Sequence, residues 1–133
     1  MRVRFLAPVA AVTAFLALAV VTSAHHSFAA EYDRNKPVTL TGTVTKVEWQ
    51  NPHIYFYLDV KGPDGKVENW AIEGGAPNAL YRAGWRKDWL EVGRPVTVDA
   101  WLAKSGAKLA NLRSMVLPDG RRVSGASSAG NGN

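Results

Sequence analysis

The sequence predicts a mainly β domain, a small five-stranded OB-like barrel with one short helix between the third and fourth strands. Three observations support this prediction. Several segments alternate between apolar and polar residues, and turns rich in glycine and proline separate them. Three strands, a short helix and two further strands is also the element order of an OB-fold barrel. A simple five-stranded meander with a packed helix is the alternative. The predicted strands comprise residues 38–44, 54–60, 67–73, 96–102 and 109–117.

The first predicted strand is bent. Residues 38–44 alternate strictly, but the alternation then slips because Val44 and Val47 are three positions apart. A β-bulge near Thr45 would restore the pattern and bend the strand. Gly42, inside the strand, fits the same need for curvature.

The second and third predicted strands form a hairpin. Every second residue of the segment 54–60 is apolar, and Tyr55, Tyr57 and Asp59 occupy the opposite face. The turn at residues 62–65 reads Gly-Pro-Asp-Gly, in which proline presets φ and glycine permits a positive φ.

A short helix is predicted at residues 76–84. Pro77 suits an early helical position, and Gly84 suits the C-terminal stop. The last two strands follow, so that residues 25–123 form the predicted barrel domain. Residues 124–133 contain only Ser, Gly, Ala and Asn, which predicts a disordered tail.

The inward positions of these strands supply enough apolar side chains for a small core that needs no disulfide or metal ion to stabilise it. Each one contributes about 1.5–3 kcal/mol when it is fully buried. The predicted core residues are Val38, Leu40, Val44, Ile54, Phe56, Leu58, Trp70, Ile72, Val96, Val98, Leu112 and Val116.

Residues 1–24 have the features of a secretory signal peptide. A basic start precedes an apolar stretch at residues 5–21, and small residues lead to a cut after Ala24. An uncleaved membrane anchor is the alternative, but this stretch, interrupted by Pro8, is shorter than the about 20 apolar residues that a span needs. We therefore expect a periplasmic or secreted protein with no stable membrane span after cleavage.

Charge and cysteine content narrow the classes of partner. Removal of Arg2 and Arg4 lowers the basic count from 16 to 14 against 11 acidic residues, a net charge of about +3. This mild excess does not predict a nucleic-acid partner. The chain has no cysteine, which excludes disulfides, thiolate metal sites and catalytic thiols.

The three histidines form the candidate metal site. A cut after Ala24 would make His25 the first residue, with a free α-amine whose pKa of about 7.7–8.0 lets a metal displace its proton. The amine and the imidazole would chelate the ion together, and His26 or His53 would add a third nitrogen. Such donors favour copper, with nickel next. The sequence thus predicts a binding protein with copper as its expected ion.

Other uses of these histidines stay open. A cut after Ser23 would place His26 third in the chain, where the amine, two backbone amides and its imidazole form a square-planar storage site for copper or nickel. Zinc held by all three histidines is a further alternative. The alternative is that none of the histidines binds a metal. His25 and His26 would then be frayed residues without a function, and His53 would only form hydrogen bonds with backbone groups at the turn.

Tyr55, Tyr57 and Trp49 form a second candidate site. Aromatic side chains on the outer face of the first two strands are typical of ligand platforms on OB barrels. In an exported protein the ligand would be a glycan, a small molecule or another protein, without any metal. The alternative is that these aromatics only favour strands and pack under loops or the N-terminal segment.

The chain contains no catalytic motif. It has no nucleophile elbow or phosphate loop, and too few histidines for a triad away from the signal junction. The acids Glu48, Glu68 and Glu73 lie on strands, but nothing in the sequence pairs them for acid–base work. We therefore expect no enzyme activity and no catalytic residues.

Several short motifs between residues 24 and 123 occur together in one known group of proteins. They are Ala24-His25-His26-Ser27-Phe28, Glu31-Tyr32-Asp33, residues 40–44, Trp49, Asn51-Pro52-His53, Gly84-Trp85 and residues 117–121. On these motifs the chain resembles an uncharacterised (domain-of-unknown-function) family of small exported bacterial proteins. The resemblance implies export and a small β-barrel, and it draws attention to the His-His and Asn-Pro-His segments. It implies no activity.

Overall fold

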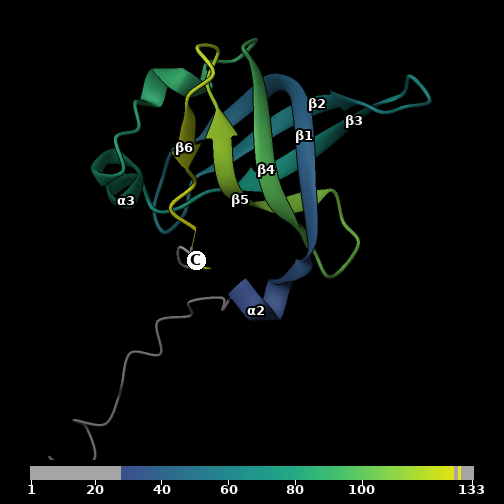
Figure 1. The fold of residues 1–133 in the computed structure, drawn as a ribbon, viewed down its shortest axis with the longest axis horizontal. Coiled ribbons are helices and arrows are strands. Elements are labelled where there is room, and N and C mark those ends of the chain that lie inside the picture. The colour runs from purple at the N-terminus through teal and green to yellow at the C-terminus, as the bar shows by residue number, and fades with distance from the viewer. Residues whose placement is uncertain (1–27, 128, 130–133) are drawn as a thin grey trace, which may run out of the picture.

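The computed structural model describes residues 28–127 and 129, and this part of the chain is mainly β (Figure 1). It contains six strands, two short α-helices and one turn of 3-10 helix. The elements are α2 (Phe28–Glu31), β1 (Tyr32–Glu48), β2 (Tyr55–Lys61), β3 (Val67–Glu73), α3 (Pro77–Arg82), the 3-10 turn η1 (Lys87–Leu90), β4 (Pro95–Ala103), β5 (Leu109–Val116) and β6 (Arg122–Ser124).

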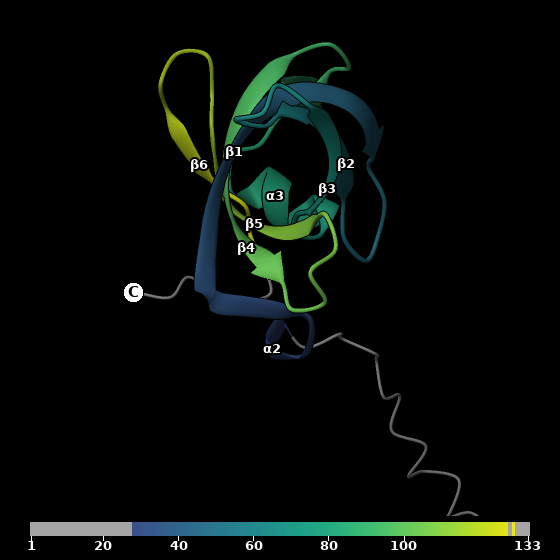
Figure 2. The same ribbon diagram turned by 90° about the vertical axis from the view of Figure 1, so that its right-hand side faces the viewer.

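The strands pair in the order β3-β2-β1-β4-β5-β6, and all neighbours in this order are antiparallel. β3 also pairs in parallel with β5, from Ala71 opposite Leu109 to Glu73 opposite Asn111. β1 to β4 therefore each have two strand partners, and β5 has three. Figure 2 shows that these strands curve around a common centre, where α3 is visible between them.

The predicted bend of β1 is confirmed. The register of β1 against β2 shifts between Val44 and Lys46, where the alternation of the sequence slips. Position 42 requires glycine because the backbone of β2 lies very close to it. A Cβ there would lie 2.5 Å from the carbonyl oxygen of Asp59. β1 consequently pairs with β2 through one half and with β4 through the other.

The start of regular structure differs from the prediction. The first predicted strand begins at residue 38, but α2 begins at Phe28 and β1 at Tyr32. The reason is a second, smaller apolar cluster, in which Phe28 and Tyr32 are buried with Ala103. Charged and polar residues at 33–36 interrupt any sequence pattern that would reveal this contact.

The core lies largely where the sequence places it. Of the predicted core residues, Val38 and Trp70 are partly buried against the main cluster, Val116 is half-buried at the end of β5, and the other nine are buried. The sequence missed Leu80 and Trp85, which are fully buried. They come from α3 and the segment after it, which carry no alternation.

α3 occupies the predicted place between β3 and β4, which confirms the helix. The segment after β6 also packs against the sheet. Indole Nε1 of Trp85 donates to the Ser124 carbonyl at 2.7 Å, and the Gly125 amide donates to the Arg113 carbonyl at 2.8 Å. Packing therefore extends past the predicted domain boundary at Val123. The rest of the predicted tail, residues 128 and 130–133, lies outside the described part, as does the predicted signal peptide.

Candidate functional site

A buried carboxyl group at the end of β3 is the centre of the candidate site. Glu73 is only 4% exposed, and three side chains from separate segments converge on it. Its Oε1 lies 2.8 Å from Nδ1 of His53, and its Oε2 accepts a hydrogen bond from the Tyr32 hydroxyl. Tyr55 is its cross-strand partner.

Local structure fixes each of these groups. The β2–β3 hairpin pairs residues that are equidistant from Asp64 in its turn, and this register brings Tyr55 opposite Glu73. His53 precedes β2, and its neighbour Ile54 is held by two backbone bonds, to the Gly75 carbonyl at 3.1 Å and from the Gly74 amide at 2.9 Å. The turn chemistry of one hairpin thus determines that Tyr55 lies opposite the carboxyl group.

Tyr32 and Tyr55 both remain neutral hydroxyl donors beside Glu73. Burial raises the pKa of Tyr32 far above its ordinary value of 10.0, and the hydrogen bond and the charge of Glu73 raise it further. The pKa of Tyr55 is raised first by burial, then by the charge of Glu73 and a hydrogen bond to it. The buried carboxyl group is therefore surrounded by groups that can donate hydrogen bonds to its oxygens, as burial of such a group requires.

The Glu73 contact determines the orientation of the His53 imidazole. A neutral imidazole has one donor and one acceptor nitrogen, so an Nδ1–H that donates to Glu73 leaves the lone pair on Nε2. The His53 side chain is 19% exposed. A carboxylate that accepts a hydrogen bond from one ring nitrogen is the usual partner of a metal-binding histidine.

His25 and His26 lie outside the described residues. They precede Phe28 by three and two positions, and α2 leads directly into Tyr32, which bonds to Glu73. Tyr32 therefore connects α2 to the site that contains His53. Glu31 also lies near, since its charge contributes to the raised pKa values of Tyr32 and Tyr55.

Within residues 28–127 and 129, no three His, Cys, Asp or Glu side chains are grouped so that they could hold a metal ion. The described part supplies one oriented imidazole and its buried carboxyl partner. In the same part, no helix is both long and apolar enough to cross a membrane.

The three residues of the predicted aromatic face have different surroundings. Tyr55 and Tyr57 lie on one face of β2, where the Tyr57 hydroxyl donates to Glu48 at 3.0 Å and Lys46 Nζ lies 5.1 Å from its ring centroid. Trp49 packs instead against the core cluster, and its ring is tilted by 43° relative to that of Trp85, with ring centroids 6.5 Å apart. Its Nε1 is buried and has no hydrogen-bond partner in the part of the chain that the structure describes.

Sequence reasoning missed Glu73 and Tyr32 as site residues. Glu73 was treated as an unpaired acid at the end of a strand. Two features of the sequence could have indicated Glu73. The first is the hairpin register, which pairs Glu73 with Tyr55, close in sequence to His53. The second is Gly74-Gly75, which follows Glu73 and has no side chains, so that other segments can approach closely there. Nothing in the sequence could have found the contact with Tyr32, because 41 positions separate the two residues.

Fold and site together define a small β protein with one histidine held against a buried carboxyl group. The chain belongs to a family of unknown function, DUF6152, whose model matches residues 13–111. This confirms membership of an uncharacterised family. Searches of curated proteins and of solved structures gave no match.

Proposed function

We propose that this chain is an exported metal-binding protein that binds copper through His53 and the histidines at the N-terminus left by signal-peptide cleavage. The observation that carries the proposal is the 2.8 Å contact between His53 Nδ1 and Glu73 Oε1. It fixes the ring and leaves Nε2 for a metal. Binding, not catalysis, is the proposed role.

We also propose that the strands form an OB-like barrel. The parallel pairing of β3 with β5 supports this, because it joins the two ends of the order β3-β2-β1-β4-β5. The helix between β3 and β4 supports it too. In such a barrel His53 lies just before β2, at the same end of that strand as its partner Glu73 on β3.

The length of chain between Tyr32 and the N-terminal histidines suits the proposed site. The four residues of α2 cover about 6 Å at 1.5 Å per residue. His25 lies three residues further, which adds at most about 11 Å of extended chain. Because Tyr32 is bonded to Glu73, and Glu73 contacts His53, a tether of this length permits the α-amine to reach His53 Nε2.

The donor set favours copper. An α-amine and imidazole nitrogens suit Cu(II), then Ni(II), better than a carboxylate-rich site would. If the cut falls after Ala24, the amine and imidazole of His25 leave a position that His53 fills. If it falls after Ser23, His26 completes a four-nitrogen plane without His53. Zinc held by all three histidines stays the alternative by ligand type.

Native mass spectrometry of the exported protein, with and without Cu(II), tests the proposal. A chain that begins at His25 and keeps one copper in the presence of a weak chelator would support it. A chain that begins at Ala24 with bound copper would replace it by the amino-terminal storage site. A different start, or no retained copper, would contradict metal binding.

Tyr55 and Tyr57 favour a second candidate, a module that binds a small ligand, a glycan or a protein without metal. Their rings share one face of β2, which is the observation behind this candidate. Tyr55→Ala and Tyr57→Ala would then abolish ligand binding, whereas His53→Ala would not. Under the copper proposal His53→Ala has the larger effect on metal uptake.

A further inference from the structure

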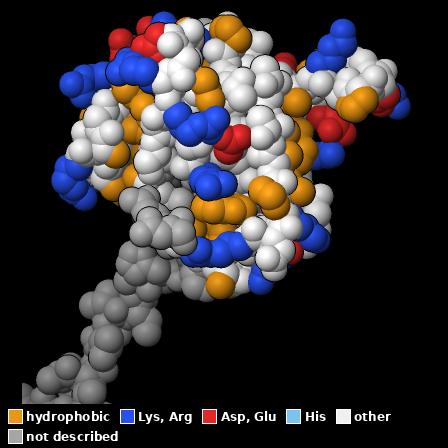
Figure 3. Space-filling model, viewed as in Figure 1, with side chains coloured by type: hydrophobic (Ala, Val, Ile, Leu, Met, Phe, Trp, Pro, Cys, Tyr) orange, Lys and Arg blue, Asp and Glu red, His pale blue; other side chains and the backbone are white. Residues whose placement is uncertain are grey.

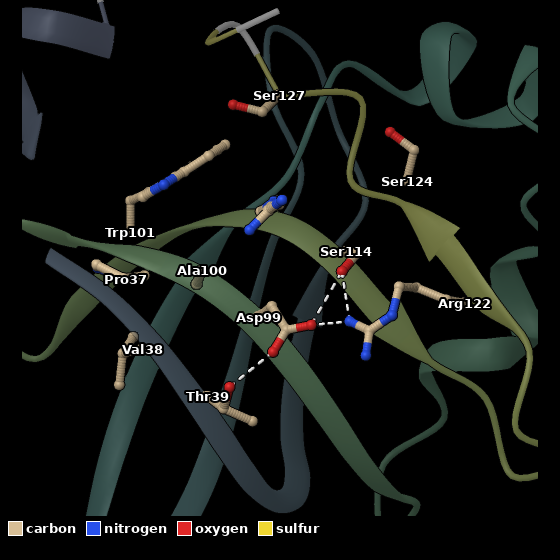
Figure 4. A pocket seen from close by; sticks show the side chains of 11 residues that line it. Pro37, Val38, Thr39, Asp99, Ala100, Trp101, Ser114, Arg122, Ser124 and Ser127 are labelled. Carbon is tan, nitrogen blue, oxygen red and sulfur yellow. Dashed lines mark hydrogen bonds and ion pairs between the residues drawn. The ribbon is translucent and has the colours of Figure 1, made fainter. Parts of the chain in front are cut away.

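A pocket lies between β1, β4, β5, β6 and the segment that carries Ser127, and it shares no lining residue with the Glu73 site (Figure 4). Its volume is about 680 Å³, within the range of pockets that hold small molecules. Three of its lining residues are charged: Asp99, Arg113 and Arg122. Figure 3 shows basic, acidic and hydrophobic side chains close together over this part of the molecule.

The acidic residue of the pocket is already satisfied. Asp99 accepts hydrogen bonds from the Thr39 hydroxyl at 2.7 Å and from the Ser114 hydroxyl at 3.2 Å, and it forms an ion pair with Arg122. Arg122 also donates to the Ser114 hydroxyl at 2.9 Å. The dashed lines in Figure 4 mark this network. Its bonds hold Arg122 in place and neutralise its charge.

Arg113 is different. It extends from β5, is exposed, and its guanidinium carbon lies 5.9 Å from the centroid of the Trp101 ring. Within the described part of the chain it forms no ion pair with a carboxylate. With Asp99 paired to Arg122, the charged side chains of the pocket keep one positive charge, that of Arg113.

Trp101 gives the pocket a flat apolar wall. The ring is half-buried, and Phe28 packs against it edge-on at a centroid distance of 5.2 Å. A second guanidinium, that of Arg34, lies 6.0 Å from its centroid. The wall is therefore held by its neighbours before any ligand arrives, which lowers the entropy cost of binding.

We propose that this pocket binds a small monoanionic carboxylate whose flat apolar body lies against Trp101. The planar guanidinium fork of Arg113 matches the two oxygens of a carboxylate. Among the residues that line the pocket, only Arg113 has a positive charge without a carboxylate partner in the described part of the chain, and this charge matches one negative charge on the ligand. The indole face offers the contact area that a flat body needs. This site is independent of metal binding at His53.

Benzoate and its neutral analogue benzamide are a matched pair of probes for the purified protein. We expect benzoate to produce saturable NMR shifts of the Trp101 indole N–H, and benzamide to produce none. Arg113→Gln should weaken benzoate binding about tenfold, the loss expected for one charged hydrogen-bonding partner at a partly exposed site. Arg82→Gln, an exposed arginine on α3, is the control and should leave binding unchanged.

Three results would overturn the proposal: no saturable shift at about 10 mM benzoate, a concentration that would reveal even millimolar affinity; equal binding of benzamide; or unchanged binding by Arg113→Gln. The probe comparison uses the unmodified protein, so it stands even if the variant is unstable. Inorganic phosphate that displaces benzoate with equal affinity would also contradict the role given to the flat body.

Discussion

Nδ1 of His53 and Oε1 of Glu73 lie 2.8 Å apart, and the carboxyl group that holds the imidazole is itself almost completely buried. Tyr32 on β1 donates a hydrogen bond to the same carboxyl group, and Tyr55 on β2 lies opposite Glu73 in the strand pairing. The imidazole is therefore oriented by a carboxyl group whose surroundings come from three segments, β1, β2 and β3. A histidine that only ended a turn would not need this support, and the predictions below follow from it.

The first prediction concerns the carboxyl group. Glu73→Gln keeps the shape of the side chain but removes the charge that orients the imidazole. We expect the affinity for Cu(II) to fall about 10–100-fold, as for other partners of metal-binding histidines. Competition with a chelator of known affinity measures this loss. Glu68→Gln on the same strand is the matched control, because Glu68 is exposed and forms its ion pair with Lys108, away from the imidazole. An unchanged affinity in Glu73→Gln would show that the contact does not serve metal binding.

The second prediction concerns the anchor of the N-terminal segment. Tyr32→Phe removes the hydroxyl that bonds to Glu73 and leaves a buried oxygen with one partner fewer. The free energy of unfolding should fall by about 1–3 kcal/mol, as measured by urea denaturation. Tyr81→Phe should cost little, because Tyr81 is 45% exposed. Equal stabilities of the two variants would argue against a structural role for the Tyr32–Glu73 bond.

The pKa of Tyr32 predicts how stability depends on pH. Its pKa in the folded protein is raised above the ordinary value of 10.0, so the folded state holds the proton more tightly than the unfolded chain. The stability linked to this group is complete below a pH of about 10 and is lost as the pH rises above it. Urea denaturation across this range should show a fall that is smaller in Tyr32→Phe. Identical slopes in the two proteins would contradict the shift.

The fourth prediction tests the bend of β1. A Cβ at position 42 would lie 2.5 Å from the carbonyl oxygen of Asp59, a backbone atom that cannot move without disturbing β2. Gly42→Ala should therefore lower the free energy of unfolding by about 1–3 kcal/mol. Thr43→Ala, at the next and exposed position, is the control. Thermal or urea unfolding of both variants checks the difference, and a Gly42→Ala protein as stable as the control would refute the close approach.

The fold was predictable where local pattern determines it. Alternation placed the β2–β3 hairpin, the slip between Val44 and Val47 located the bulge, and Pro77 marked the helix. The start of β1 was not predictable, because Tyr32 is held by contacts with Ala103 and Glu73, far along the chain. Local sequence carries no signal for such contacts.

The candidate site was predictable only in part. Residue type and the Asn51-Pro52-His53 motif recommended His53, but its partner Glu73 looked like one more acidic residue on a strand. Its burial depends on three segments that meet only in the folded protein. The aromatic residues show the opposite case: Tyr55, Tyr57 and Trp49 look alike in sequence, yet Trp49 packs into the core cluster and Tyr55 serves the carboxyl group.

The most direct test of the account is the affinity of the exported protein for Cu(II) with and without the imidazole of His53. Competition titrations of the wild-type chain and of His53→Ala, with the N-terminal residue of each confirmed by mass, give this comparison. The account predicts binding at least about tenfold weaker in His53→Ala, since one nitrogen ligand is lost. Equal affinities would contradict it and would assign any bound copper to the N-terminal residues alone.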